Sequence, residues 1–212
     1  MKGEDTKKII VKKALELFSE RGYDAVSVGD IAKAVGIKAP SLYNHFESKQ
    51  AIFKAIVEET SVRYESGTDE INVHVQNVKR DIPSLKGITE EELFNKLLAV
   101  FEFSLHDETV RRFRKMMTIE QYRSTELAGL YSYRFVERLV AYHAEIFKKL
   151  IAAGEIAEND PEALSMIYIA PVITLLGVCD RQPEREDECI KKLKAHVNLF
   201  FNAFNVIRGN KQ

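Results

Sequence analysis

Apolar residues recur three or four positions apart along most of the chain, and this spacing predicts helices rather than strands. The first helix covers about residues 6–21 and ends at Gly22. A second helix begins at Ser27, where Asp30 completes a capping box three positions later, and it ends at Gly36 after about two turns. The chain therefore opens with one ordinary helix followed by a very short one.

A third helix begins at Pro40, because the proline ring fixes the backbone angle that the first residue of a helix needs. It carries residues 41–46, and Ser48 then caps a fourth helix that runs to about Ser66. Residues 67–88 give no clear pattern, so we expect a long loop with some helix there. The second and third helices, with the glycine turn between them, have the layout of a helix-turn-helix.

Further helices are expected beyond residue 88, each with its own start signal. They begin near Thr89, Asp107, Ser124, Asp160 and Glu184. The helix at Pro161–Val178 is apolar on nearly every face, so it must be covered on all sides. No segment gives a convincing strand, and we expect an all-α fold of about nine helices.

The last helix, about Glu184–Arg208, carries a seam of apolar residues that alternate three and four positions apart. The seam consists of Ile190, Leu193, Val197, Phe200, Phe204 and Ile207. Since one chain is not expected to cover both this seam and the helix before it, we predict a homodimer whose contact is made by the last two helices. The alternative is that both helices complete the core of the single chain.

Composition adds little to this picture. The 212 residues are 45% hydrophobic and 30% charged, as in an ordinary globular protein, and the net charge of -1 gives no sign of a nucleic-acid partner. Residues 1–49 carry nine Lys or Arg against seven acidic residues, which is a weak excess. Only Cys179 and Cys189 are present and no signal peptide is apparent, so we expect a cytoplasmic protein. The apolar run over 163–178 falls short of the roughly 20 residues that a membrane span needs, and we expect a buried core helix.

An enzyme is the first alternative class, and the sequence lacks its usual parts. None of the five histidines has a glutamate three positions before it, which is the ligand spacing of di-iron helical bundles. No H-E-x-x-H, G-x-G-x-x-G or G-x-S-x-G motif occurs, so we expect no catalytic site, no metal and no cofactor. His143 is expected to be a core or pocket histidine. A second alternative is a helical interaction module whose helix-turn-helix contacts protein rather than DNA.

The stretch from Ser27 to Phe53 resembles the signature of the TetR family of transcriptional regulators. It reads S-V-G-D-I-A-K-A-V-G-I-K-A-P-S-L-Y-N-H-F-E-S-K-Q-A-I-F, with L-Y-N-H-F followed three residues later by a lysine. The resemblance implies a DNA-binding domain over residues 1–50 and a helical effector-binding and dimerisation domain over residues 51–212. It also implies a repressor that a small-molecule effector releases from its operator.

Within this motif, several side chains suit contact with double-stranded DNA. Tyr43 offers a hydroxyl to a phosphate, and Lys49 offers a charge in the first turn of the fourth helix. Asn44 is the candidate for reading a base edge, since a carboxamide pairs with adenine through two hydrogen bonds. The expected DNA-binding residues are Ser27, Lys38, Ala39, Pro40, Ser41, Tyr43, Asn44, His45 and Lys49, although His45 also suits packing in the motif. A dimer would present two recognition helices, so the operator is expected to be a near-palindrome.

The effector pocket is the part that the sequence defines least. Large residues on helices that surround the effector in the family are its candidate lining, although aromatic stripes more often form plain core. They are Phe101, Phe113, Met117, Tyr122, Tyr131, Phe135 and Tyr168. The identity of the effector does not follow from these residues.

Overall fold

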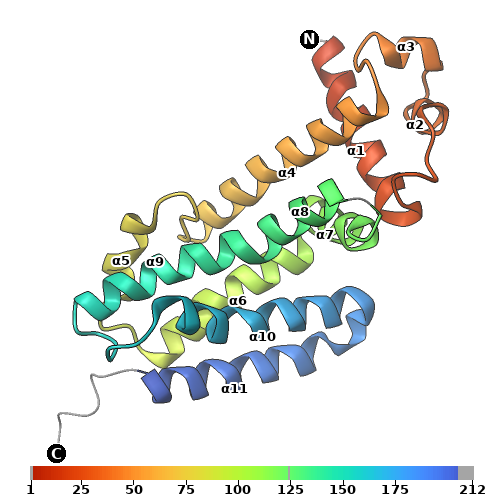
Figure 1. Cartoon of the computed structure of the whole chain (residues 1–212). Helices are drawn as coiled ribbons and strands as arrows, with labels where there is room; N and C mark the ends of the chain where they lie inside the picture. The colour runs from red at the N-terminus through yellow and green to blue at the C-terminus, as the bar shows by residue number, and fades with distance from the viewer. Residues whose placement is uncertain (1, 124, 205–212) are drawn as a thin grey trace, which may run out of the picture. The chain divides into compact units, whose positions relative to one another are not determined.

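The computed structural model describes residues 2–123 and 125–204, which are helical along most of their length (Figure 1). The helices are α1 (Lys2–Arg21), α2 (Val28–Val35), α3 (Ala39–Tyr43), α4 (Lys49–Glu70), α5 (Val78–Leu85), α6 (Glu90–His106), α7 (Glu108–Glu120), α8 (Thr125–Ser132), α9 (Arg138–Ala152), α10 (Pro161–Arg181) and α11 (Glu186–Phe204). A π-helical turn, η1 (Tyr133–Glu137), joins α8 to α9, and a 3₁₀ turn, η2 (Pro183–Arg185), joins α10 to α11. The expected all-α class is confirmed.

Two features raise the number of helices above the expected nine. The first is α5, which lies in the segment expected to be mostly loop. Its buried Asp81 accepts a hydrogen bond of 2.6 Å from the hydroxyl of Tyr142, 61 residues further along the chain. Because the two residues are so far apart, this hydrogen bond leaves no local pattern in the sequence. The second is the π turn, which divides the expected long helix into α8 and α9. Ser124, the expected start of that long helix, lies outside the described residues.

The capping box predicted at the start of the second helix is present. At the start of α2, the hydroxyl of Ser27 accepts from the backbone N–H of Asp30 at 3.0 Å, and the Asp30 carboxylate accepts from the backbone N–H of Ser27 at 2.8 Å. The hydrogen bonds from Ser27 hold the pKa of the Asp30 carboxyl below its usual value. Thr89 and Glu92 form the same reciprocal pair at the start of α6. The positions at which these two helices begin are thus confirmed.

Contacts divide the chain into two units, and the first comprises residues 1–64 and 107–131. In this unit α1 packs against α2 and α7, while α2 packs against α3. Fully buried side chains close its core, namely Ile10, Phe18, Ile31, Leu42, Ile52, Ile56, Met116 and Met117. The first unit is larger than the DNA-binding domain expected over residues 1–50, and that boundary stays a prediction about function.

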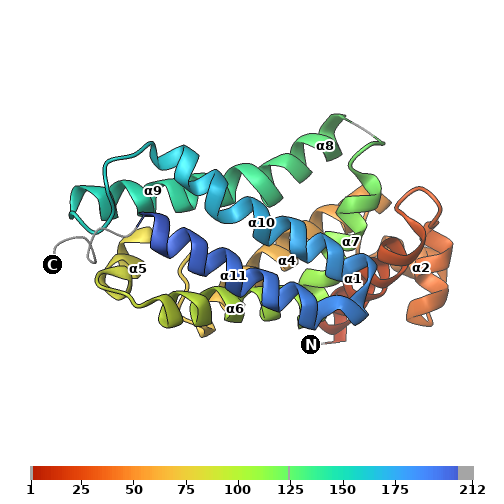
Figure 2. The same cartoon turned by 90° about the horizontal axis from the view of Figure 1, so that it is seen from below.

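The second unit comprises residues 65–106 and 132–212. Helix α10 packs here against α9, α11 and α6, and Figure 2 shows α10 and α11 side by side. Its core includes Phe101, Phe147, Leu164, Tyr168, Leu193 and Phe200. By length and composition alone α10 is apolar enough to cross a membrane, contrary to our expectation. Its inward side belongs to the core of the unit, which is also typical of the central helix of a globular protein.

Candidate nucleic-acid interface

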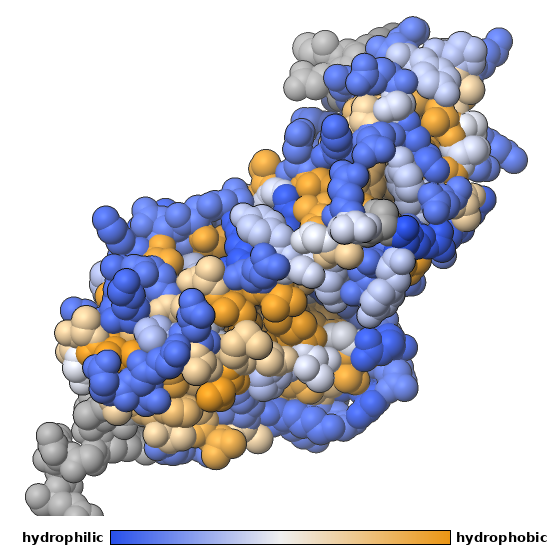
Figure 3. All heavy atoms as spheres, in the orientation of Figure 1, coloured by the Kyte–Doolittle hydropathy of each residue, from blue (hydrophilic) through white to orange (hydrophobic). Residues whose placement is uncertain are grey.

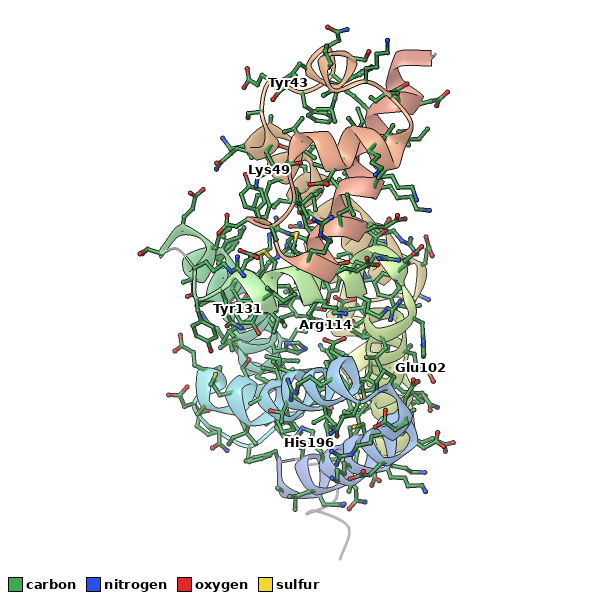
Figure 4. All side chains as sticks on the ribbon, turned by 90° about the vertical axis from the view of Figure 1, so that its right-hand side faces the viewer. Tyr43, Lys49, Glu102, Arg114, Tyr131 and His196 are labelled. Atoms are coloured by element: carbon green, nitrogen blue, oxygen red, sulfur yellow. The ribbon has the colours of Figure 1, made fainter. Side chains whose placement is uncertain are left out.

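Helix α3 carries most of the polar residues that the sequence singled out for DNA. Lys38 directly precedes the helix, and its carbonyl accepts from the backbone N–H of Ser41 at 2.9 Å. Pro40, Ser41, Tyr43 and Asn44 are exposed, and Tyr43 has 54% of its surface accessible. Figure 4 shows Tyr43 at the end of the first unit where α3 lies. These side chains form one open polar surface, which we call the α3 surface.

A glycine turn and one buried leucine hold α3 in place. Gly36 has a φ of 80°, in the left-handed region that favours glycine. The backbone N–H of Gly36 and that of Ile37 satisfy the last carbonyls of α2, at 3.2 and 2.9 Å. On the inner side of α3, Leu42 is 0% exposed. Because both the turn and the anchor are fixed, the α3 surface is presented in a defined direction.

Lys49 makes its contacts within the protein. Its Nζ donates to the carbonyl of Tyr23 at 2.9 Å and to the carbonyl of Val26 at 3.1 Å. The ammonium group also lies 4.1 Å from the centre of the Tyr23 ring, a favourable cation–π arrangement. In Figure 4 Lys49 lies deeper in the first unit than Tyr43. Lys49 therefore fixes the segment that leads into α2, and a direct phosphate contact stays a prediction that this geometry does not favour.

Glu120 on α7 holds the same segment, although no sequence motif predicts this role. The side chain is 1% exposed, and its Oε1 accepts from the backbone N–H of Tyr23 at 2.8 Å. Its Oε2 lies 3.6 Å from Nε of Arg123, whose Nη1 is 3.3 Å from the carboxylate of Asp24. Gly22 leaves room for this carboxylate, because a Cβ at that position would lie 2.8 Å from Oε1 of Glu120. Since Tyr23 and Glu120 are 97 residues apart, no local motif reveals the contact.

The other residues expected at the DNA lie beside the α3 surface or beneath it. The hydroxyl of Ser27 is occupied by the capping box of α2. Ala39 and His45 are half-buried, as is Phe46, whose ring centre lies 5.4 Å from Nζ of Lys7. These residues support the motif, in line with the packing role that the sequence also allowed for His45.

The residues expected around an effector do not all lie in one unit. Phe113 and Met117 are buried in the first unit and Tyr131 is half-buried there, whereas Phe101, Phe135 and Tyr168 belong to the second unit. Tyr122 is 90% exposed, so it lines no interior site. Over the described ranges 2–123 and 125–204, no three His, Cys, Asp or Glu residues lie close enough together to hold a metal ion.

The seam expected at a dimer contact lies in the core of the single chain. Leu193 and Val197 are 0% exposed and Phe200 is 5% exposed. Ile190 and Phe204 are partly buried against the same core. Ile207, the last member of the seam, lies outside the described residues. Because α11 turns this seam toward α10 and α6, its buried residues are not available to a partner. This burial corresponds to the alternative that the sequence left open, in which the last two helices complete the core of the single chain.

Other apolar side chains of α10 and α11 remain accessible. On α10, Met166 is 48% exposed and Ile167 is 50% exposed, and on α11 Leu199 is 70% exposed. Apolar side chains, coloured orange and tan, also gather where α10 runs in the space-filling view (Figure 3). We call Met166, Ile167 and Leu199 the outer apolar residues.

Helices α2 and α3 are joined by a glycine turn, and a buried leucine holds α3 with its polar side chains on the open side. This arrangement is a helix-turn-helix, so the first unit carries a DNA-binding domain. Comparison with known protein families agrees with this assignment. Residues 10–56 match the family described as "Bacterial regulatory proteins, tetR family". The negative transcriptional regulator IcaR of the biofilm operon icaADBC in Staphylococcus aureus is 52% identical over 48 residues. That match spans 23% of this chain and only 26% of the length of IcaR.

Solved structures extend the similarity of fold beyond this segment. A putative TetR-family regulator from Mesorhizobium loti has a TM-score of 0.69 at 20% identity, over 97% of this chain and 100% of that chain. SmeT of Stenotrophomonas maltophilia, in its triclosan complex, has a TM-score of 0.68 at 20% identity, over 96% of this chain and 93% of SmeT. Residues 10–56 therefore carry a domain of the tetR family of bacterial regulatory proteins, and the fold of nearly the whole chain is similar to that of these two structures.

Proposed function

We propose that the protein is a transcriptional repressor that binds a near-palindromic operator as a homodimer and leaves it when a small-molecule effector binds. The observation that carries the proposal is the α3 surface, where Tyr43 and Asn44 are exposed on a helix that Leu42 anchors. The description of IcaR as a negative transcriptional regulator supports repression, and the triclosan complex of SmeT supports an effector.

In this proposal the exposed residues of α3 have separate tasks. The hydroxyl of Tyr43 donates to a phosphate, which positions the helix without reading sequence. Asn44 pairs with an adenine in the major groove, and Lys38 and Ser41 contact a phosphate or a base at the start of α3. DNA binding is assigned to residues 1–50, effector binding and dimerisation to residues 51–212, and the repressor works in the cytoplasm.

The dimer contact is assigned to the last two helices, as the sequence indicated, but to their outer apolar residues. Helix α10 keeps an apolar side out of the core, with Met166 and Ile167 about half exposed. A two-fold contact there would remove these side chains from water, and such self-complementary contacts are typical of homodimers. A two-fold dimer reads two related half-sites, which is the reason for the near-palindromic operator.

Titration of labelled promoter DNA from the protein's own gene tests DNA binding. We expect affinity to fall steeply as salt is raised, because phosphate contacts release counterions. Asn44→Ala should lose about 1–3 kcal/mol of discrimination at one base pair of each half-site, whereas Tyr43→Phe should weaken binding to all sequences alike.

Asn95→Ala provides the matched control, because Asn95 is an exposed asparagine on α6 in the second unit. It should bind DNA like the unchanged protein. A protein that shows no salt-dependent affinity for this promoter, or for a random pool of duplexes, is a protein-interaction module instead, and the proposal fails.

A further inference from the structure

Helix α5 and the residues beside it, 74–86, cover one side of the core of the second unit, and we call them the α5 segment. Helix α5 packs against α9 and lies beside it in Figure 1. Val78, Ile82 and Leu85 recur on one face of α5 and are partly buried against the core. The helix has eight residues and contains Pro83, which has no backbone N–H to donate. So short a helix depends on its contacts with the rest of the unit.

A buried carboxylate lies within this apolar face. Asp81 is 4% exposed, and it accepts a hydrogen bond of 2.6 Å from the hydroxyl of Tyr142 on α9. Its Oδ1 lies 2.7 Å from Nδ1 of His74, and its Oδ2 accepts from the backbone N–H of His74 at 3.1 Å. Burying a carboxylate is costly unless it is hydrogen-bonded, so these three contacts allow α5 to pack with Asp81 inside.

The three contacts differ in what happens to them when α5 moves. His74 and Asp81 both belong to the α5 segment, seven positions apart, so they stay paired wherever the segment goes. Tyr142 is 61 residues further along the chain, on α9. Moving α5 away from α9 therefore breaks the hydrogen bond to Tyr142 but leaves the carboxylate paired with His74. Because water then bonds to both separated groups, the net cost of breaking this contact is modest.

The backbone hydrogen bonds next to α5 are also local. The N–H of Asn77 bonds to the carbonyl of His74 at 2.7 Å, and the N–H of Arg80 bonds to the carbonyl of Asn77 at 2.9 Å. Both bonds move with the segment. The side chain of Gln76 donates to the carboxylate of Glu65 on α4, but this contact is exposed, so water can replace either partner.

The chain is fixed just outside each end of the α5 segment. On the first side, the N–H of Val73 bonds to the carbonyl of Thr68 at 2.9 Å and closes the end of α4, with Asn72 in the left-handed region at a φ of 58°. On the other side, Gly87 has a φ of 64°. The segment between these two turns is thus attached to the rest of the unit through side chains.

We propose that the α5 segment is a lid on the core of the second unit, which opens as one body when the hydrogen bond between Asp81 and Tyr142 breaks. Helices α9, α10 and α11 stay folded when it opens. Opening uncovers the apolar face of α5 and the side of α9 beneath it, so the second unit exposes or covers an apolar surface without unfolding. The inference concerns the second unit alone and holds whether or not the protein binds DNA.

Hydrogen exchange followed by mass spectrometry tests the lid. In the unchanged protein the amides of α5 should exchange faster than those of α10 and α11. Low concentrations of urea should leave the rate in α5 unchanged, because a local opening exposes little surface, whereas exchange in α10 and α11 requires unfolding and should respond steeply. If α5 and these two helices share one rate and one urea dependence, α5 opens only when the unit unfolds, and the proposal is overturned.

Tyr142→Phe tests the hydrogen bond that holds the lid. It removes the hydroxyl and keeps the ring, so it should shift the lid toward the open form and speed the exchange of α5 about tenfold. Tyr133→Phe, at an exposed tyrosine of η1, is the control and should leave the exchange of α5 as it is in the unchanged protein. Equal exchange of α5 in the two variants overturns the role of Tyr142.

Val197→Ala separates opening of the lid from a general loss of stability. Val197 on α11 is 0% exposed, so its truncation weakens the core of the second unit. Exchange in α10 and α11 should become about tenfold faster or more, while exchange in α5 stays unchanged, because the open lid leaves this core intact. Acceleration of α5 by the same factor as α10 and α11 overturns the proposal.

Discussion

At the scale of single residues, Lys49 acts as a support for the segment that precedes α2. Replacing it with methionine keeps the length of the side chain but removes two hydrogen bonds to the carbonyls of Tyr23 and Val26 and the contact with the Tyr23 ring. We expect Lys49→Met to lower the free energy of unfolding by about 1–3 kcal/mol. Chemical denaturation followed by circular dichroism measures this loss.

Lys54→Met is the control for this prediction, because Lys54 is an exposed lysine on the same helix. It should change the free energy of unfolding by less than about 0.5 kcal/mol. If Lys49→Met is as stable as Lys54→Met but loses affinity for DNA, then Lys49 contacts a phosphate directly and its internal contacts contribute little.

Glu120 gives a second prediction at this scale. Its Oε1 accepts from the backbone N–H of Tyr23, and the side chain is almost fully buried. Glu120→Ala leaves that N–H without its partner and opens space beside Gly22, so we expect a loss of about 2–4 kcal/mol in the free energy of unfolding. Glu120→Gln keeps an oxygen acceptor of nearly the same shape and should lose less. Equal losses in the two variants would show that the hydrogen bond to Tyr23 is not what stabilises this contact.

At the scale of elements, one glycine of α4, Gly67, lies directly against the ring of Phe103 on α6. An ideal Cβ at Gly67 would lie 2.1 Å from Cζ of Phe103. Alanine is ordinarily better than glycine inside a helix by about 1 kcal/mol, but overpacking costs about 1–3 kcal/mol and should outweigh that gain here. Gly67→Ala is therefore expected to lower the melting temperature, as measured by differential scanning calorimetry.

Gly129 on α8 offers a matched control, since a Cβ there would meet nothing within 4 Å. Gly129→Ala should stabilise the protein by up to about 1 kcal/mol. Adding Phe103→Leu to Gly67→Ala should recover part of the lost stability, because the smaller side chain leaves room for the Cβ. No recovery in the double variant would rule out the contact with Phe103 as the cause.

Also at this scale, the beginnings of helices were predictable because a cap is a local interaction. Ser27 and Asp30 are three residues apart, and so are Thr89 and Glu92, so their hydrogen bonds are visible in the order of the residues. Helix α5 was not predictable in the same way, since its buried Asp81 depends on a hydroxyl group from α9.

At the scale of the whole molecule, the prediction concerns its oligomeric state. We expect the protein to sediment as a dimer at micromolar concentration. Ile167→Glu combined with Leu199→Glu should yield a monomer with unchanged helical content, because both side chains are at least half exposed in the single chain. Val62→Glu is the control, since Val62 on α4 is also exposed, at 66%, but lies outside the last two helices.

A monomeric protein without any substitution would contradict both the dimer and the near-palindromic operator. A dimer that persists in the double variant but dissociates in Val62→Glu would place the contact on another helix. Phe200→Glu is not a suitable test, because Phe200 is buried in the core of the chain and its replacement should unfold the second unit.

The sequence by itself determined the helix-turn-helix. Its parts are short-range: the capping box at Ser27, the left-handed turn at Gly36, and an alternation that buries Leu42 and leaves Tyr43 and Asn44 exposed. Each depends on residues within about one or two helical turns, so their order in the chain is enough to specify them. The polar side chains offered to DNA follow from the same local pattern.

Only the tertiary structure decided which groups Lys49, Glu120 and the apolar seam of α11 contact. A lysine in the first turn of a helix suits a phosphate as well as a carbonyl, and the choice depends on Tyr23 and Val26 being folded against it. The spacing of the seam shows that α11 has an apolar side but not whether its own chain or a partner covers that side. Burial is a property of the packed chain, and contacts between distant residues such as Tyr23 and Glu120 exist only once the helices have packed.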